Sequence, residues 1–169
     1  MFLHGTPGSR LSRPDDDALG GVRLITLDRP GYGLSTPVRR PSLLGVAGDV
    51  AALTGSLGIE RFGVAGFSGG APYALACGAR FPQRLTGVIV AGGTGPAREL
   101  GTLTRWEWLQ VRDVRCRVLL WAGRDDPGRA VPDAALMAER LPDAEVTIAG
   151  DAAHTPSPEH WRAMLGRFE

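Results

Sequence analysis

The chain has 169 residues, of which 43% are hydrophobic and 22% charged, so it is long enough to form one domain with a sizeable core. Nineteen Lys and Arg residues against 18 Asp and Glu residues give a formal charge of +1, so a partner nucleic acid or an anionic membrane is not expected. No apolar run approaches the length of a membrane span and no charged-then-apolar segment opens the chain, so we expect a cytoplasmic protein.

The cysteines and histidines indicate neither disulfides nor a metal site. Cys77 and Cys116 lack the spacing of a disulfide framework or of a C-x-x-C motif, and buried thiols are expected. His154 and His160 are six residues apart, so they are not neighbours on one helix face, and His4 is remote from both in the sequence. We therefore expect no metal and no organic cofactor.

Apolar runs alternate with turn residues and predict strands and helices in alternation. The expected strands are residues 1–3, 22–27, 61–65, 85–91, 116–122 and 145–149. The expected helices are residues 43–57, 71–80, 133–141 and 158–168, with a weaker candidate at 11–20.

The expected strands are apolar on both sides instead of alternating between apolar and polar residues. This pattern, with a helix between successive strands, predicts an α/β fold in which helices cover both faces of a mostly parallel sheet. Ligands bind to such sheets beyond the carboxyl ends of the strands. Ser68, Asp126, His154 and residues 4–6 all follow expected strands, so we expect these groups to share one edge of the sheet.

Residues 66–70 read Gly-Phe-Ser-Gly-Gly, a G-x-S-x-G pentapeptide between an expected strand and an expected helix. Gly66 and Gly70 leave room for a tight turn, because a Cβ at either position would crowd the adjoining strand or helix. Such a turn would hold Ser68 with its hydroxyl outward. In a chain with 24 glycines the pentapeptide alone is weak evidence, and a plain strand-to-helix connection is the alternative.

Five segments, in this order, together resemble the α/β-hydrolase fold family, and the resemblance covers nearly the whole chain. They are residues 4–8 (His-Gly-Thr-Pro-Gly), 28–35 (Asp-Arg-Pro-Gly-Tyr-Gly-Leu-Ser), 66–70, 123–126 (Gly-Arg-Asp-Asp) and His154.

The resemblance implies a catalytic triad. Ser68 would be the nucleophile, His154 the general base, and Asp126 the acid that orients His154, with Asp125 as the fallback. An ordinary loop histidine and ordinary turn aspartates before Pro127 are the alternatives for these positions.

The same resemblance implies an oxyanion hole formed by the backbone N–H groups of two residues, Thr6 and Gly69. His4 is expected to shape the oxyanion loop. The residues that would line the substrate pocket are His4, Phe67, Trp106 and Trp108.

Two parts of the family fold have no counterpart in the sequence. The chain begins at what resembles the third family strand, so we expect a single domain over residues 1–169 with six strands in the order 4-3-5-6-7-8 of the family numbering. Strand 22–27 would then be an exposed edge, which a homodimer could cover. Only residues 97–115 stand where the family has a helical lid, so the lid is expected to be almost absent.

These features predict a serine hydrolase that cleaves a small ester or related acyl substrate through an acyl-enzyme on Ser68. A serine at this position disfavours the epoxide hydrolase and haloalkane dehalogenase chemistries, which use an aspartate there. Two alternatives stay open: an acyltransferase or cyclase with the same triad, and a non-catalytic binding protein on a truncated hydrolase scaffold.

Overall fold

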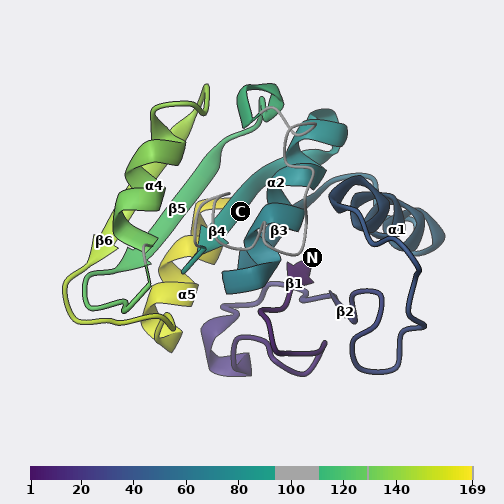
Figure 1. Cartoon of the computed structure of the whole chain (residues 1–169), viewed down its shortest axis with the longest axis horizontal. Helices are drawn as coiled ribbons and strands as arrows, with labels where there is room; N and C mark the ends of the chain where they lie inside the picture. Colours follow the sequence, from purple (N-terminus) through teal and green to yellow (C-terminus); the bar gives the residue numbers. More distant parts are fainter. Residues whose placement is uncertain (94–110, 129, 169) are drawn as a thin grey trace.

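The computed structural model describes residues 1–93, 111–128 and 130–168. Within them, six parallel strands form one sheet in the order β2-β1-β3-β4-β5-β6 (Figure 1), which confirms the predicted α/β fold and the predicted strand order. The strands are β1 (Phe2–Leu3), β2 (Thr26–Leu27), β3 (Phe62–Phe67), β4 (Leu85–Ala91), β5 (Val118–Gly123) and β6 (Ala144–Ala149).

Helices cover both faces of this sheet, as predicted. Helices α1, α2 and α4 pack on one face, and α5 packs on the other with a short 3-10 turn (Figure 1). The α-helices are α1 (Leu43–Ser56), α2 (Ala71–Arg80), α4 (Ala130–Ala138) and α5 (Pro158–Leu165). The 3-10 turns are η1 (Asp16–Ala18), η2 (Ser68–Gly70), η3 (Pro82–Arg84), η5 (Val111–Asp113) and η6 (Gly166–Phe168).

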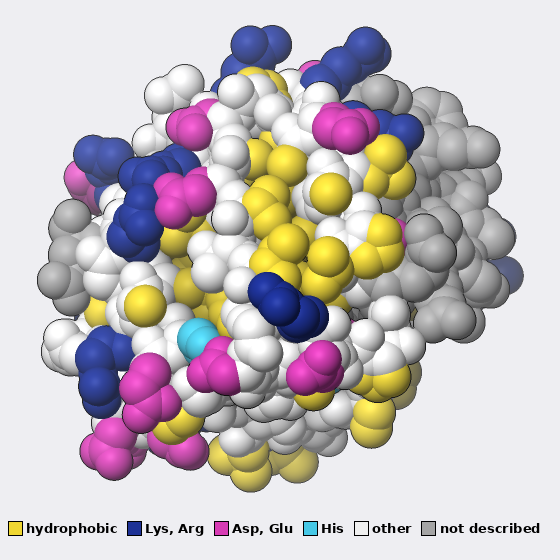
Figure 2. Space-filling view, turned by 90° about the vertical axis from the view of Figure 1, so that its left-hand side faces the viewer, with side chains coloured by type: hydrophobic (Ala, Val, Ile, Leu, Met, Phe, Trp, Pro, Cys, Tyr) yellow, Lys and Arg dark blue, Asp and Glu magenta, His cyan; other side chains and the backbone are white. Residues whose placement is uncertain are grey.

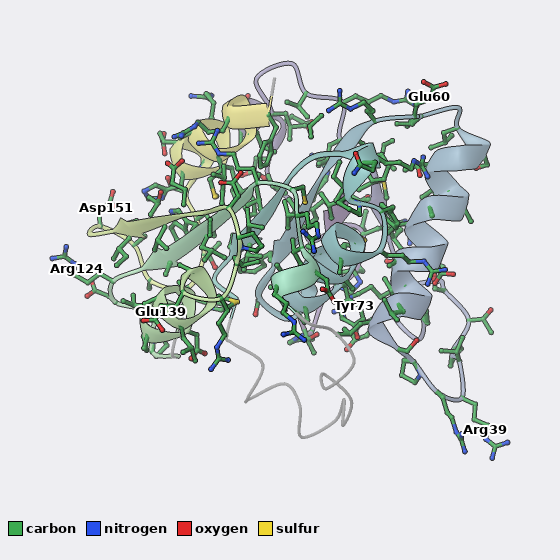
Figure 3. The ribbon with its side chains drawn as sticks, turned by 90° about the horizontal axis from the view of Figure 1, so that it is seen from above. Arg39, Glu60, Tyr73, Arg124, Glu139 and Asp151 are labelled. Atoms are coloured by element: carbon green, nitrogen blue, oxygen red, sulfur yellow. The ribbon has the colours of Figure 1, made fainter. Side chains whose placement is uncertain are left out.

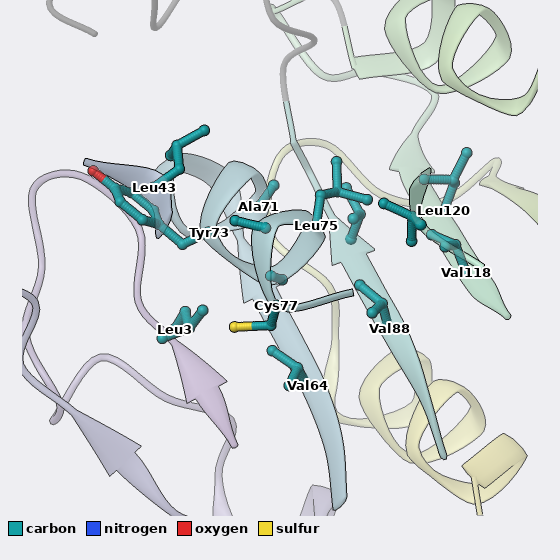
Figure 4. Close-up of a cluster of buried hydrophobic side chains, with 14 of the residues drawn as sticks. Leu3, Leu43, Val64, Ala71, Tyr73, Leu75, Cys77, Val88, Val118 and Leu120 are labelled. Carbon is teal, nitrogen blue, oxygen red and sulfur yellow. The ribbon is translucent and has the colours of Figure 1, made fainter. Parts of the chain in front are cut away.

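The inner strands are apolar on both sides because each side faces a separate core. Successive side chains of a strand point to opposite faces. Val64 therefore joins the core under α1, α2 and α4, whereas Ala65 joins the core under α5. Figure 4 shows the larger core, where Leu75 and Cys77 of α2 lie over the sheet.

Two sequence predictions near the N-terminus are wrong. Residues 11–20 form only the short turn η1, since Pro14 lies in the segment and Gly20 has a positive φ of 57°. The predicted strand 22–27 shrinks to Thr26–Leu27, because its one partner among the described strands, β1, is itself only two residues long.

Both edges of the sheet carry a strand with a single partner among the described residues. β2 is one edge, and a homodimer that covers it stays a prediction. β6 is the other, and on it Val146 is 37% and Ile148 45% exposed. Figure 2 faces the side on which β6 and α4 lie and shows apolar side chains in a band between charged groups.

Among the helices of the described structure, none is both long and apolar enough to cross a membrane. Figure 3 shows labelled charged groups that point outward, in contrast to Tyr73, which is 6% exposed. These outward groups are Arg39, Glu60, Arg124, Glu139 and Asp151.

Candidate active site

Ser68 lies on a sharp turn between β3 and α2. β3 ends at Phe67, the turn η2 begins at Ser68, and Ser68 has φ 48°, a left-handed conformation that is uncommon for a residue other than glycine. Such strained residues cluster at functional sites, where the surrounding structure holds them in place. The turn therefore presents the Ser68 hydroxyl beyond the carboxyl end of β3, at the edge where ligands bind in parallel sheets.

The glycines of the pentapeptide make this turn sterically possible. A Cβ on Gly66 would lie 2.5 Å from the carbonyl oxygen of Gly70. A Cβ on Gly70 would lie 2.0 Å from the carbonyl oxygen of Leu3. Because these neighbours are backbone atoms, neither clash can be relieved by a side-chain rotation.

Gly66→Ala is therefore expected to lower the free energy of unfolding by about 3 kcal/mol, as overpacking in a core does. The measurement is urea denaturation followed by circular dichroism. Gly48→Ala is the matched control, because Gly48 lies within α1 and, apart from the backbone of its own helix and its chain neighbours, no atom lies within 4 Å of the added Cβ. Removing a helical glycine should raise stability by about 1 kcal/mol. Equal stability of the two variants would contradict this account of the turn.

His154 joins Ser68 to Asp126. Its Nε2 lies 2.9 Å from the Ser68 Oγ, and its Nδ1 lies 2.7 Å from the Asp126 Oδ2. The Asp126 carboxylate can only accept, so Nδ1 carries the ring proton in the neutral imidazole and Nε2 can accept the Ser68 hydroxyl proton. This is the hydrogen-bonding state that a general base requires.

The loops after β5 and β6 are fitted together to make this contact. A Cβ on Gly123 would lie 1.8 Å from the carbonyl oxygen of Ala153, so the His154 loop can approach the end of β5 only because residue 123 is glycine. The second carboxylate oxygen of Asp126, Oδ1, accepts the backbone N–H of Gly128 at 2.7 Å. The Asp126 side chain is 2% exposed and that of His154 37% exposed, so the carboxylate is enclosed while the imidazole faces the solvent.

Asp126 and Asp125, which the sequence left as alternatives, lie in different surroundings. Asp126 bonds to His154, whereas Asp125 is exposed and its backbone N–H donates to the carbonyl of Ala152. The geometry therefore favours Asp126 as the partner of His154.

The loop that follows β1 packs against the Ser68 turn. A Cβ on Gly5 would lie 3.3 Å from the Ser68 Cβ, so the backbone of this loop lies beside the nucleophile candidate. Gly69 is buried in the first turn ahead of α2, where N–H groups lack an intrahelical acceptor. Both segments named in the oxyanion prediction thus border Ser68, and donation by Thr6 and Gly69 stays a prediction.

His4 lies in the interior, and its prediction as a pocket residue is wrong. Its side chain is 0% exposed, so it borders no space that a substrate could enter. Its Nε2 accepts the backbone N–H of Arg29 at 3.3 Å, so Nδ1 carries the proton and donates to the Gly5 carbonyl at 2.8 Å. Burial lowers the pKa of His4 below its ordinary value of 6.5. His4 therefore supports the loop as a neutral side chain.

His4 should remain neutral below pH 6.5, and this can be measured by an NMR titration of the three histidine rings. The unfolded chain binds the His4 proton at an ordinary pKa and the folded chain only at lower pH, so the unfolded state binds more protons as the pH falls. His4 therefore favours unfolding in acid, and its contribution to stability should decline below pH 6.5. A His4 ring that titrates in the folded protein above pH 6.5 would contradict this assignment.

The other predicted pocket residues divide into two groups. Phe67 is half-buried, its ring centre lies 5.2 Å from that of His154, and it lines a cavity of about 280 Å³ together with Trp161 and Thr155. Trp106 and Trp108 lie outside the described residues, as do residues 97–110 of the expected lid remnant. Within residues 111–115, Val114 is fully buried in the core under α2, so this end of the segment belongs to the domain core.

Cys77 is a core residue, as the sequence indicated. It is 0% exposed, and burial raises the pKa of its thiol to about 12, which leaves it protonated and unreactive at neutral pH. Among the described residues, no cluster of three or more His, Cys, Asp or Glu side chains could hold a metal ion.

Sequence reasoning missed Arg29. The sequence marks residues 28–35 only as a segment that resembles the family and assigns no role to Arg29, yet Arg29 is 3% exposed. Its Nη2 donates to the Gly5 carbonyl at 3.1 Å and to the Thr6 Oγ1 at 2.9 Å. The one available signal was an arginine two residues after a strand that ends at the same sheet edge as Ser68.

Comparison with known proteins agrees with this geometry. Residues 1–110 match the alpha/beta hydrolase fold family. A proline iminopeptidase of Xylella fastidiosa (strain 9a5c) is 31% identical over an alignment of 117 residues. This alignment covers 63% of this chain and 34% of that protein. The chain thus spans about a third of the length of this curated relative.

Solved structures with low sequence identity share the fold. An esterase from Thermogutta terrifontis superposes with a TM-score of 0.72 at 17% identity, covering 98% of this chain and 86% of the esterase. A proline iminopeptidase from Mycobacterium smegmatis gives 0.71 at 18% identity, covering 99% and 87%. An N-acyl homoserine lactone degrading enzyme gives 0.76 at 18% identity, covering 99% and 92%.

Proposed function

The chain belongs to the alpha/beta hydrolase fold family, and on this premise we propose that it is a serine hydrolase that cleaves a small ester or related acyl substrate. The observation that carries the proposal is the position of His154 within 2.9 Å of the Ser68 hydroxyl and 2.7 Å of the Asp126 carboxylate. A binding protein on the same scaffold would not need a nucleophile, a base and an orienting acid joined by successive hydrogen bonds.

The reaction would begin with proton transfer from the Ser68 Oγ to the His154 Nε2. The Ser68 oxygen attacks the substrate carbonyl carbon. The carbonyl oxygen becomes an oxyanion that accepts hydrogen bonds from the backbone N–H groups of Thr6 and Gly69. Each of these donors would stabilise the transition state by about 3 kcal/mol. The intermediate then collapses, and His154 donates its proton to the leaving alkoxide, which departs as the alcohol.

A water molecule completes the cycle. His154 takes a proton from the water as the hydroxyl attacks the acyl carbon, and the second tetrahedral intermediate releases the carboxylic acid. His154 returns the proton to the Ser68 Oγ. Asp126 remains a carboxylate throughout and stabilises the imidazolium that forms at each step.

A cavity lies beside Phe67, the residue before Ser68, but Ser68, Asp126 and His154 do not line it. Its volume of about 280 Å³ is close to the lower end of the range for small-molecule pockets. Phe67, Pro156 and Trp161 give it apolar walls, and Arg13 and Asp15 line it as well.

A second candidate is removal of an N-terminal proline residue, because the 31% identical relative is named a proline iminopeptidase. The two candidates share the acyl-enzyme mechanism and differ in whether the leaving group is an alcohol or an amine. Transfer of the acyl group to an acceptor other than water uses the same first half of the cycle.

Parallel assays of p-nitrophenyl acetate, p-nitrophenyl butyrate and proline p-nitroanilide test the proposal. We expect turnover of both esters and a lower kcat/KM for the anilide. A higher kcat/KM for the anilide would favour the peptidase. Addition of an alcohol acceptor, with the products separated by chromatography, would reveal acyl transfer. If a folded protein turns over none of the three substrates and is not labelled by a fluorophosphonate, the hydrolase proposal is wrong.

A further inference from the structure

We propose that Arg29 is a positioning residue, which orients the Thr6 N–H toward the substrate oxyanion from behind. This inference rests on the proposed hydrolase function. The Gly5 carbonyl and the Thr6 N–H belong to the same peptide unit. The described chain has one cis peptide bond, between Thr6 and Pro7, so the Gly5–Thr6 bond is trans. In a planar trans peptide the N–H and C=O groups point in opposite directions.

Two buried donors hold the carbonyl of this peptide unit. The Arg29 Nη2 lies 3.1 Å from the Gly5 oxygen, and the His4 Nδ1 lies 2.8 Å from the same atom. Both side chains are nearly or fully buried. Because the carbonyl is fixed toward Arg29 and His4, the Thr6 N–H is fixed in the opposite direction within the peptide plane. A second bond from the Arg29 Nη2 to the Thr6 Oγ1, 2.9 Å long, restrains the next residue as well.

The guanidinium is itself clamped between two aromatic rings. Its central carbon lies 4.6 Å from the centre of the Tyr32 ring and 4.7 Å from that of Tyr73. Figure 4 shows the Tyr73 ring beside Leu43 at the margin of the larger core, so this side of the clamp is anchored in packed side chains. The aromatic faces attract the cation and restrict its movement.

The charge of Arg29 is not neutralised by a neighbouring acid in the described part of the chain. Its sequence neighbour Asp28 accepts the backbone N–H groups of Arg10 and Leu34 and pairs with the Arg10 side chain. No ion pair between Arg29 and a carboxylate is found among the described residues. A buried cation at the carbonyl end of a peptide polarises that peptide and strengthens its N–H as a donor. Arg29 would thus both aim and strengthen the Thr6 donor.

Arg29→Met tests the proposal. It removes the charge and the N–H donors of the guanidinium and keeps a side chain of similar length. With a p-nitrophenyl ester we expect kcat to fall about 100-fold, as expected for a misplaced oxyanion donor, while KM changes little. The inhibition constant of a trifluoromethyl ketone, whose adduct with Ser68 carries an oxyanion, should rise by a similar factor. Arg29→Lys keeps the charge and should recover part of kcat.

Arg84→Met is the matched control. The Arg84 guanidinium also donates to two backbone carbonyls and a threonine hydroxyl, those of Ile59, Glu60 and Thr54, and lies 5.3 Å from an aromatic ring centre. These contacts join the turn after α1 to the start of β4, so the variant should lose stability with kcat unchanged. A purely structural role for Arg29 would give the same pattern.

The outcomes separate this inference from the proposed function. An active wild type with an unaltered kcat and inhibition constant in folded Arg29→Met overturns the role of Arg29 alone. A wild type that turns over no substrate overturns the proposed function and the role of Arg29 with it. If Arg29→Met does not fold, Thr6→Val removes the Oγ1 acceptor from the surface of the loop. It should lower kcat about 5-fold, and an unchanged kcat overturns the proposal.

Discussion

Ser68→Ala is expected to lower kcat for ester hydrolysis by about 10⁶-fold, because no other atom of the triad can form the acyl-enzyme. In the wild type, the Ser68 Oγ lies 2.9 Å from the His154 Nε2. Fluorophosphonate labelling should fall from one adduct per chain to none, as measured by intact mass spectrometry. Residual hydrolysis above the uncatalysed rate would come from substrate binding and the oxyanion donors.

Stability should respond differently from activity in this variant. Ser68 has φ 48°, and alanine retains the strain that a Cβ causes there, so Ser68→Ala should unfold within a few degrees of the wild type. Ser56→Ala is a matched control, because the Ser56 hydroxyl donates to the Leu53 carbonyl near the end of α1, remote from the site. It should keep full labelling. Labelling that persists in Ser68→Ala would place the reactive residue elsewhere.

Asp126→Asn is expected to lower kcat about 10⁴-fold at neutral pH. The Asp126 carboxylate holds the proton of His154 on Nδ1 across 2.7 Å. An asparagine amide can instead donate to Nδ1, which moves the ring proton to Nε2. The Nε2 atom then can no longer accept the Ser68 proton, although the side chains keep nearly the same shape. Steady-state kinetics with a p-nitrophenyl ester measures the loss.

Asp125→Asn is the control for Asp126→Asn, since it removes one negative charge from the adjacent residue. Asp125 is exposed, and its backbone makes the contact with Ala152, so kcat should stay within about 2-fold of the wild type. If Asp125→Asn lost activity and Asp126→Asn kept it, the assignment of the acid would be reversed.

The parts of the fold that depend on local sequence were predictable. Helix α2 and strand β4 have the predicted bounds, 71–80 and 85–91, because each is a continuous apolar segment between clear turn residues. The glycines at 66 and 70 predicted a tight turn for a steric reason that the backbone distances bear out. Parallel strands buried on both sides predicted the layers and the sheet edge at which the polar groups meet.

What depends on contacts between distant segments was decided only by the tertiary structure. A strand needs a partner, so 22–27 could not keep its predicted length beside a two-residue β1. The resemblance favoured Asp126 with Asp125 as the fallback, and the contact with the loop that carries His154 is made by Asp126. The environment of Arg29 is assembled from the loop after β1, Tyr32 of its own loop and Tyr73 of α2, so residues 28–35 alone do not encode it. Sequence thus determined where most elements and the Ser68 turn lie, while packing determined which side chains surround that turn, because a residue's burial and hydrogen-bond partners belong to the folded chain as a whole.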